Sequence, residues 1–378
     1  MGRRSRSSGL PRWAVPPLTQ AVSAGIGVLT LPGVDSSVAI AGRLGETITR
    51  LRALGMPKRV RGARERIAFA FPEWSEEQVA ACAEGVWRYA ARLFFEIARS
   101  HRVMNDDAWF RHQTFESRFP GLDDVLEGRP AITITAHLGN FELVSHAFAN
   151  LGVPAVSVYR PLDFEPMDAW MRGVRAKRGV QLVDKFGAMR RLNSIVMSGQ
   201  IPAIVADQNA GERGEFVPFF GRLASSYKSV AAVLMRTHAT AVIGAVLREG
   251  GEHALGIDEI HDGATGRRFD ELGYRVNMTS AIRYEDWKDK PDPAFYITAR
   301  YRRELEQLIR LAPDQYFWMH RCWKSRPAWE RERTGFPQEL REKLAALPWM
   351  SADDVEAIVE QSDRDAAELE RRGTDRLS

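Results

Sequence analysis

The stretch AITITAHLGNFEL, residues 131–143, decides the fold. Apolar and β-branched residues lead up to His137, as in a strand that is buried on both faces. Gly139 then allows an unusual backbone angle, and Asn140 is a residue type that often caps the first turn of a helix. The stretch therefore predicts a buried strand, a tight turn and a helix, with His137 at the carboxyl end of the strand.

Further runs of apolar or β-branched residues predict four more strands, at residues 155–159, 181–183, 201–206 and 240–247. Helix-like stretches separate the first four of the five predicted strands, at about 140–151, 166–178 and 187–199. Strands that alternate with helices indicate a largely parallel sheet with helices on both faces. Ligands bind such sheets beyond the carboxyl ends of the strands, which is where His137 is expected.

The segments on either side of this alternating region are predicted to be mainly helical. Residues 76–100 contain no Pro and carry apolar residues at helical spacing, and a long amphipathic helix is expected at 293–311. A hairpin-like region is expected around 250–280, and charged helices that look peripheral are expected from 337 to 372. The predicted fold class is α/β: a mixed, mostly parallel central sheet flanked by helices, with an N-terminal helical region and C-terminal helices.

Composition and charge limit the classes of protein that the chain can belong to. With 378 residues and 44% hydrophobic content, it can bury a full core. Residues 1–66 carry 12 Lys or Arg against 3 Asp or Glu, whereas residues 351–378 carry 4 Arg against 9 acidic residues. The basic front fits either an anionic membrane surface or a solvated helix face, and no nucleic-acid partner is expected. Cys82 and Cys322 form no CxxC motif, so neither a disulfide framework nor a metal site is expected.

The N-terminal segment from residue 13 to 42 resembles one that enters a membrane surface, because its only charge is Asp35. Three prolines argue against a spanning helix: Pro16, Pro17 and Pro32. An interfacial segment or a hairpin of helices is favoured over a true span, and a cleaved signal peptide is less favoured than either. We therefore assign residues 1–60 to a basic and apolar membrane-associating region, 61–330 to the main domain and 331–378 to a charged helical tail.

His137 and Glu142 form a chemical pattern across the predicted turn. Glu142 falls in the first helical turn, from which it can fold back toward the His137 imidazole, fix its tautomer and stabilise its protonated form. A histidine held in this way can accept the proton of a hydroxyl group that attacks a thioester carbonyl. The alternative is that His137 is a strand-end histidine with ordinary hydrogen bonds and that Glu142 is an acid favoured by the helix dipole.

Several motifs together resemble the lipid A biosynthesis acyltransferase family, over roughly residues 60–327. The motifs are HLGNFEL at 137–143, VYRP at 158–161, DQN at 207–209, EFVPFFGRLA at 215–224 and QYFWMHRCWKSRP at 315–327, with FPEWS at 71–75 and Glu96 upstream. This chain has Ser and Lys after the Phe-Gly motif where many members carry a run of Thr, and CWKS where Arg-Phe-Lys-Thr is commoner. These departures make the acceptor lipid less certain than the reaction class.

The resemblance implies roles for individual residues. His137 and Glu142 match the family's H-x-x-x-x-D/E motif, as general base and orienting acid. Arg175 matches a family arginine suited to an ionic contact with the catalytic glutamate. The residues that the resemblance assigns to substrate binding are Asn140, Arg160, Arg175, Arg178, Asp207 and Gln208. A solvated charge stripe is the alternative for the arginines of the helix before Gly179, and Asp207 has the alternative of bracing loops.

Two aromatic segments have both a functional and a structural interpretation. The resemblance makes Phe216, Pro218, Phe219 and Phe220 part of a wall for an acyl chain, whereas aromatic clusters are usually core. His320 is expected to have a structural or headgroup-contact role, because His137 already has a partner.

The function implied by the resemblance is transfer of a fatty acyl group to a hydroxyl of a lipid A precursor, at the cytoplasmic face of the bacterial inner membrane. Acyl carrier protein would be the donor and partner, with acyl-CoA as the other possible co-substrate, and no further cofactor or metal is expected. The alternatives are acylation of another glycolipid or lysolipid, such as a phosphatidylinositol mannoside, and a non-catalytic lipid-binding protein. A hydrolase is disfavoured because the chain has no Gly-x-Ser-x-Gly motif.

Overall fold

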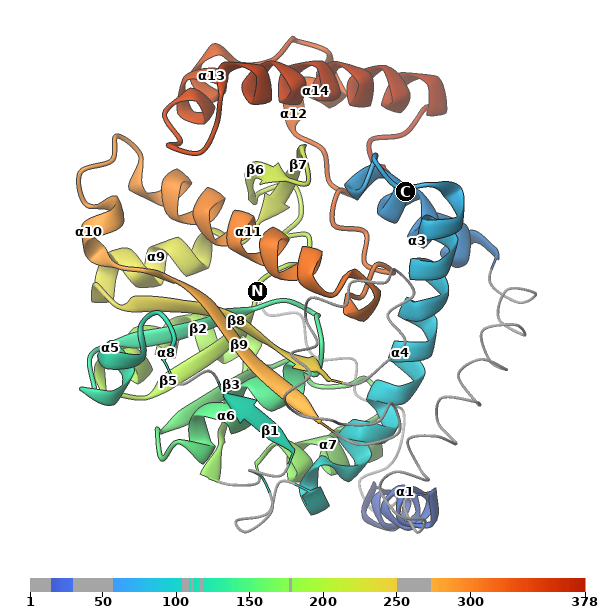
Figure 1. Cartoon of the computed structure of the whole chain (residues 1–378), viewed down its shortest axis with the longest axis vertical. Coiled ribbons are helices and arrows are strands. Elements are labelled where there is room, and N and C mark those ends of the chain that lie inside the picture. The colour runs from blue at the N-terminus through green and yellow to red at the C-terminus, as the bar shows by residue number, and fades with distance from the viewer. Residues whose placement is uncertain are drawn as a thin grey trace.

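A mixed sheet forms the centre of the protein in the computed structural model (Figure 1). The model describes residues 15–29, 57–103, 109, 112–115, 118–176, 179–249 and 273–377. Within these residues the sheet has seven strands in the order β1-β9-β8-β2-β5-β3-β4. Strands β8, β2, β5, β3 and β4 are mutually parallel, and β9 runs antiparallel to β8. The predicted α/β class with a mixed, mostly parallel sheet is confirmed.

The strands that sequence patterns predicted all form, with bounds that shift by one residue at most. These five are β2 (Ala131–Thr135), β3 (Ala155–Tyr159), β4 (Gln181–Asp184), β5 (Ile201–Val205) and β8 (Thr240–Arg248). The sheet also contains β1 (Gln113–Phe115), which no sequence pattern predicted, and β9 (Tyr274–Ile282). Strand β9 is the second strand of the expected hairpin-like region, and it pairs with β8 along its whole length. Residues 250–272 of that region lie outside the described residues.

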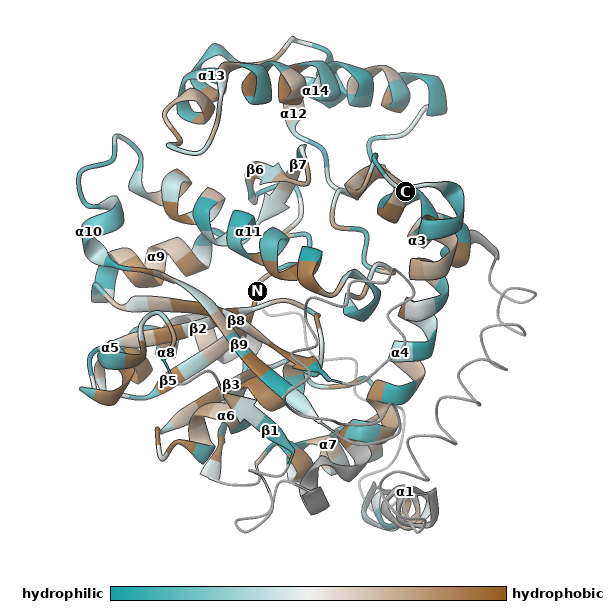
Figure 2. Ribbon diagram, in the orientation of Figure 1, coloured by the Kyte–Doolittle hydropathy of each residue, from teal (hydrophilic) through white to brown (hydrophobic). Residues whose placement is uncertain are grey.

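Helices cover both faces of the sheet. They are α5 (Leu122–Leu126), α6 (Val144–Asn150), α7 (Glu165–Arg175), α8 (Lys185–Met197), α9 (Lys228–Thr237), α10 (Tyr284–Trp287) and α11 (Pro293–Leu311). One buried cluster joins alternate residues of β2 and β8 to α8, α9 and α11, and a second joins the intervening residues to α5 and α6. Figure 2 shows the hydrophobic residues concentrated in the central strands, as burial on both faces requires.

The N-terminal helices lie beside the sheet. They are α1 (Val15–Leu29), α3 (Pro57–Ala70) and α4 (Glu76–Val103), and α4 extends the helix that was predicted over residues 76–100. Helix α1 contacts α7, and α3 packs against α4 (Figure 1). No helix in the described part of the chain is long and apolar enough to cross a membrane. Most of the segment at 13–42 beyond α1 lies outside the described residues.

The Phe-Gly motif forms a separate β-hairpin of β6 (Glu215–Phe219) and β7 (Arg222–Ser226). Its two turn residues, Phe220 and Gly221, both have positive φ, as a type I′ hairpin turn requires. Phe216, Phe219 and Phe220 are buried in the main core cluster, where Phe220 packs against Trp318. These contacts support the interpretation that the aromatic residues of the hairpin are part of the core.

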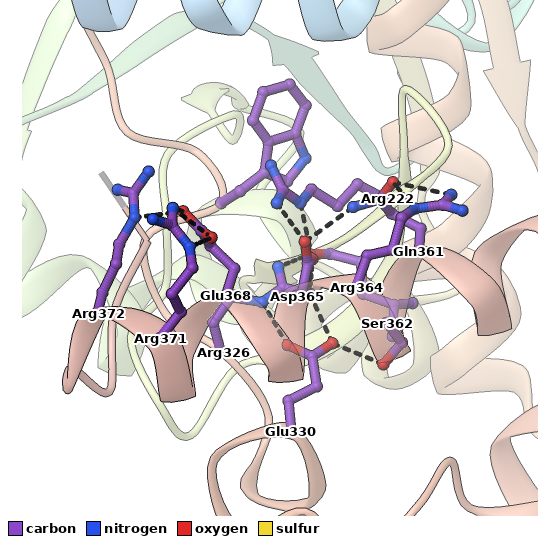
Figure 3. A network of polar contacts seen from close by, with 12 residues as sticks. Arg222, Arg326, Glu330, Gln361, Ser362, Arg364, Asp365, Glu368, Arg371 and Arg372 are labelled. Atoms are coloured by element: carbon purple, nitrogen blue, oxygen red, sulfur yellow. Dashed lines mark hydrogen bonds and ion pairs between the residues drawn. The ribbon is translucent and has the colours of Figure 1, made fainter.

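The C-terminal helices are α12 (Ala328–Glu332), α13 (Gln338–Ala345) and α14 (Ala352–Arg372), and α13 and α14 form a layer above α11 and the hairpin (Figure 1). The expectation that the helices over 337–372 are peripheral was wrong for both α13 and α14, and Leu340 and Leu344 of α13 belong to the main core cluster. Val355 and Ile358 belong to the main core cluster. Beside them, Arg326 donates to both Glu330 oxygens and is 2.8 Å from Asp365 (Figure 3).

This set of contacts, here called the C-terminal network, consists of Arg222, Arg326, Glu330, Ser362 and Asp365 (Figure 3). Arg222 donates to Asp365 at 2.7 Å, and Ser362 donates to Glu330 at 2.7 Å. Arg326 also donates to the Leu223 carbonyl, and its side chain is 0% exposed. The sequence showed only an acidic tail, because charge composition cannot reveal which carboxylates meet buried arginines from a distant segment.

Candidate active site

The turn after β2 is held at the carboxyl edge of the sheet by backbone contacts. Gly139 has φ +54°, and a Cβ at this position would lie 2.2 Å from the Val246 carbonyl oxygen. Asn140 donates its backbone N–H to that same carbonyl at 2.8 Å. The Phe317 N–H donates to the His137 carbonyl at 3.0 Å, so the late aromatic motif pins the other side of the turn. A side chain at position 139 would collide with the Val246 carbonyl, so the sharp turn after His137 requires Gly there.

His137 bonds to Asp207 rather than to Glu142. Its Nδ1 is 2.8 Å from Asp207 Oδ1, and Asp207 follows β5, the strand beside β2, so both side chains leave the same edge of the sheet. Since the buried carboxylate can only accept, Nδ1 carries the proton and donates it, and Nε2 is left with a lone pair. The expectation that Glu142 contacts the imidazole and fixes its tautomer was therefore wrong. Asp207 fixes the tautomer instead.

Glu142 instead forms a two-point ion pair with Arg175. Arg175 donates from Nε at 2.7 Å and from Nη2 at 2.5 Å, and each side chain is 12% exposed. Glu142 lies in a short 3₁₀ helix, Phe141–Leu143, that precedes α6, and Arg175 ends α7. A planar guanidinium satisfies a carboxylate in this geometry better than an imidazole can, which accounts for the correction. The expected ionic contact between Arg175 and the glutamate is confirmed.

The charges around His137 favour its protonated form. Burial acts to lower the pKa of His137, but the Asp207 carboxylate, its hydrogen bond and the more distant Glu142 carboxylate outweigh burial and raise this pKa above its usual value. Burial also acts to raise the pKa of Asp207, yet the neighbouring imidazole holds that pKa well below its usual range. Asp207 therefore stays ionised, as a residue that stabilises an imidazolium must.

Gln208 and His320 lie on the other side of the imidazole. The Gln208 amide nitrogen is 3.4 Å from His137 Nε2 and 3.2 Å from His320 Nε2. The rings of His137 and His320 are 4.5 Å apart between centroids, and Phe141 approaches the His137 ring from another side at 4.9 Å. His320 was expected to have a structural or headgroup-contact role, and it lies directly beside the candidate base.

Asn140 is a structural residue of the turn. Its side chain makes no helix-capping hydrogen bond, contrary to the N-cap expectation, and is 0% exposed, so it is not placed to bind a substrate. Its Nδ2 donates to the Tyr274 hydroxyl at 3.2 Å, and that hydroxyl donates to Glu96 at 2.6 Å. Glu96 also pairs with Arg248, so a buried network from α4, β8 and β9 supports the turn.

One of the expected arginines is exposed in its loop, and another lies outside the part of the chain that the structure describes. The Arg160 side chain is 66% exposed and lies 4.0 Å from Asp163 of its own loop, which is the solvated arrangement. Arg178 lies outside the described residues. Arg172, on the same helix as Arg175, pairs with Asp168 at 3.0 Å and is 45% exposed. Among the helix arginines that the structure describes, Arg175 alone meets the catalytic turn.

Arg302 is a part of the site that the sequence gave no reason to select. It is 0% exposed on α11, donates from Nη1 to the Asp207 carbonyl at 2.8 Å, and stacks over the Phe219 ring at 3.8 Å. A single arginine among the many charges of an amphipathic helix carries no sequence signal that marks it as buried. No group of His, Cys, Asp or Glu within the described ranges is arranged to hold a metal ion.

Comparison with known proteins identifies the family. The family model "Bacterial lipid A biosynthesis acyltransferase" matches residues 18–325, most of the chain. The chain belongs to this family. It is 25% identical to a lipid A biosynthesis palmitoleoyltransferase of Escherichia coli over 294 residues, which cover 75% of this chain and 85% of that protein. It is 23% identical to the E. coli lipid A biosynthesis lauroyltransferase over 312 residues, which cover 80% and 91% of the two chains.

A third relative is a lipid A biosynthesis acyltransferase of Haemophilus influenzae, 22% identical over 70% of this chain and 75% of that protein. The protein is therefore a lipid A acyltransferase family enzyme, an acyltransferase with a lipid acceptor. The matched range includes β2, β5 and the late aromatic motif, so it contains His137, Asp207, Gln208 and His320. It ends before α12, so α13 and α14 lie outside it.

Proposed function

We propose that this acyltransferase moves a fatty acyl group from the thioester of acyl carrier protein to a hydroxyl of a lipid A precursor, with His137 as general base. The observation that carries the proposal is the hydrogen bond from His137 Nδ1 to Asp207, which leaves Nε2 as the basic nitrogen. His137 is 19% exposed and Asp207 is 0% exposed, so the base reaches a substrate while its partner stays buried.

The chemistry needs one proton acceptor. The acceptor hydroxyl gives its proton to His137 Nε2 as its oxygen attacks the thioester carbonyl, and a tetrahedral intermediate forms. When this intermediate collapses, the carbon–sulfur bond breaks and the thiolate takes the proton back from the imidazolium. Asp207 stabilises the imidazolium between these steps. The products are an ester of the acceptor and the free thiol of the donor, and the enzyme is unchanged.

Glu142 acts through charge and through Arg175 in this proposal. Its carboxylate adds to the field that raises the pKa of His137, and it holds the Arg175 guanidinium between the catalytic turn and α7. Arginine recognises phosphates and carboxylates with its planar donors, so Arg175 is the candidate for a contact with an anionic lipid. In this assignment Asp207 orients the base, and Glu142 supports its charge.

Membrane association is the second part of the proposal, at the cytoplasmic face of the bacterial inner membrane. Helix α1 has 15 residues and no charged side chain, and its Leu18 is 36% exposed. The loop after β3 exposes Leu162 (41%) and Phe164 (46%) just before α7, the helix that α1 contacts. Apolar side chains exposed next to the carboxyl edge of the sheet suit a bilayer surface that supplies a lipid acceptor.

Binding to vesicles tests the membrane part. Leu162→Asp combined with Phe164→Asp should weaken pelleting with vesicles of phosphatidylglycerol and phosphatidylethanolamine by about tenfold, because two apolar side chains no longer enter the interface. Leu126→Asp is the matched control, since Leu126 is 62% exposed on α5, at the amino-terminal edge of the sheet. Equal loss of binding in both variants would contradict this orientation.

A transfer assay tests the reaction. Purified protein in detergent would be offered labelled acyl carrier protein or acyl-CoA against a lipid A precursor and a mannosylated phosphatidylinositol, with His137→Ala as control. Acylation of the lipid A precursor that depends on His137 is the expected result. Transfer to the other lipid alone would keep the mechanism and change the acceptor, and binding without transfer to any acceptor would support a non-catalytic lipid-binding protein.

A further inference from the structure

Gln208 and His320 occupy the side of the His137 ring on which the reaction must occur. All three side chains are partly exposed, whereas Asp207 behind the ring is fully buried. The Gln208 amide nitrogen lies between the two Nε2 atoms, 3.4 Å from His137 and 3.2 Å from His320. A substrate oxygen that donates to His137 Nε2 can therefore come within hydrogen-bonding range of Gln208 as well.

The buried carboxylate fixes the direction of every hydrogen bond along this chain of side chains. In the neutral ring, which is the form that acts as a base, Asp207 requires the His137 proton on Nδ1, so His137 Nε2 can only accept. The group of Gln208 that faces it must then be the NH₂ group, which only donates. The same NH₂ group faces His320 Nε2, so this nitrogen must also accept, and His320 is a neutral ring with its proton on Nδ1.

The surroundings of His320 keep it neutral. Burial lowers the pKa of His320 to about 4, with a further lowering by the His137 charge that the Asp207 carboxylate only partly opposes. The backbone holds the ring in place, because the His320 N–H donates to the Phe317 carbonyl at 2.9 Å and the Phe317 N–H donates to the His137 carbonyl. A neutral acceptor at this position can hold one N–H of Gln208 without competing for the proton that His137 takes.

We propose that Gln208 is a catalytic residue that donates its second N–H to the thioester carbonyl oxygen as negative charge develops on it, and that His320 is a positioning residue that fixes this amide. The inference rests on the proposed function, since it needs His137 as the base. In the free enzyme the second N–H points at His137 Nε2 over 3.4 Å, longer than an ordinary hydrogen bond. When the substrate enters, this N–H donates to the substrate oxygen instead of to His137. The hydrogen bond between Gln208 and His320 stays in place.

Steady-state kinetics of the full chain test the two roles. Gln208→Met keeps the length of the side chain and removes the donor, and should lower kcat by about 10²- to 10³-fold with a small change in KM. His320→Phe removes the acceptor and should lower kcat by about 2- to 10-fold, the effect of losing one neutral hydrogen bond. His320→Gln offers a carbonyl acceptor to the same amide and should restore most of the loss.

The double variant separates a positioning role from a merely structural one. Because His320 acts through Gln208, adding His320→Phe to Gln208→Met should cost about nothing further in kcat, as expected for residues that act as a unit. Fully multiplicative losses, or a His320→Gln variant no better than His320→Phe, would overturn the inference. Near-ultraviolet circular dichroism and thermal melts of each variant exclude misfolding as the cause of a loss.

A spectroscopic measurement tests the hydrogen-bond directions without using activity. Long-range ¹H–¹⁵N spectra of the histidine-labelled protein, recorded at alkaline pH above the raised pKa of His137, should show both His137 and His320 protonated on Nδ1, with both Nε2 atoms unprotonated. A His320 ring protonated on Nε2 would overturn the inference. The result for His137→Ala keeps the two proposals apart: if that variant stays active the proposed function fails, whereas an inactive His137→Ala with a fully active Gln208→Met removes only this inference.

Discussion

The catalytic turn and the C-terminal network are both built from carboxylates that meet nitrogen bases, yet they differ in what they leave unbonded. In the network, Arg326 and Asp365 are 0% and 1% exposed and each meets more than one partner. In the turn, His137 is 19% exposed and keeps a basic nitrogen on its accessible side. A carboxylate and a nitrogen base therefore stabilise the fold when all of their polar atoms are bonded and buried. The same kind of pair can transfer a proton when one nitrogen lone pair stays free on the side that the substrate can reach.

The largest expected effect is on activity and comes from His137→Ala. Loss of the general base should lower kcat/KM by about 10²- to 10⁴-fold. Arg302 still donates to the Asp207 backbone carbonyl, but the buried Asp207 carboxylate loses its imidazole partner, so the melting temperature should fall while the variant stays folded. Kinetics measures the loss of kcat/KM, and calorimetry on the same preparation measures the melting temperature. Wild-type turnover would contradict the assignment of this region as catalytic.

The next effect is on stability and comes from Asp365→Ala in the C-terminal network. Removing this buried carboxylate leaves the Arg222 guanidinium without its carboxylate and Arg326 with Glu330 alone, which should cost about 3–5 kcal/mol of unfolding free energy. Urea denaturation measures it. The folded fraction should retain its kcat, since the network contains none of the catalytic side chains.

Arg364→Ala is the matched control on the same helix. Arg364 is 61% exposed and pairs with Glu360 at 3.6 Å, so its removal should change the unfolding free energy by no more than about 0.5 kcal/mol. Similar losses for Asp365→Ala and Arg364→Ala would mean that the network does not hold α14 in place.

A smaller effect, the coupling energy between Glu142 and Arg175, shows whether this pair serves catalysis, like the catalytic turn, or stability, like the C-terminal network. A double-mutant cycle of Glu142→Ala and Arg175→Ala should give a coupling energy of about 0.5–3 kcal/mol, because the two side chains touch. We expect the coupling to appear in kcat/KM more than in the unfolding free energy. Coupling confined to stability would move the pair into the structural class with the C-terminal network.

The smallest effect is a displacement of the pH profile. His137 works as a base when it is neutral, so kcat/KM rises with pH through the pKa of His137, which Asp207 raises above its usual value. Asp207→Asn should therefore move the acid limb to lower pH in addition to lowering the rate. Glu142→Gln should move it in the same direction by less, because Glu142 is the lesser cause.

Asp163→Asn is the control for the pH measurement. Asp163 is 87% exposed in the loop after β3, and the acid limb should stay where it is in the native enzyme. An acid limb that Asp207→Asn leaves in place would show that a group other than His137 controls it.

The alternation of strands and helices was readable from the sequence because each buried strand is a short apolar run and each helix ends at a turn residue. The strand–turn–helix at 131–143 predicted both the sheet edge and His137 on it. Asn140 does occupy the N-cap position, but its buried side chain makes no capping hydrogen bond and is instead held through Nδ2 by the hydroxyl of the distant Tyr274. The substrate-binding role of Arg160 stays a prediction, since its side chain is exposed and lies near Asp163 of its own loop.

The sequence by itself determined the α/β class, the position of His137 and the pairing of Arg175 with Glu142, because these follow from local pattern and motif. Only the tertiary structure decided that Asp207 holds the imidazole, that Gln208 and His320 flank it, and that α14 is anchored by Arg326. The physical reason is that hydrogen bonds between residues far apart in the chain depend on which strands become neighbours. Once β5 lies beside β2, Asp207 reaches His137, and Arg175 takes Glu142.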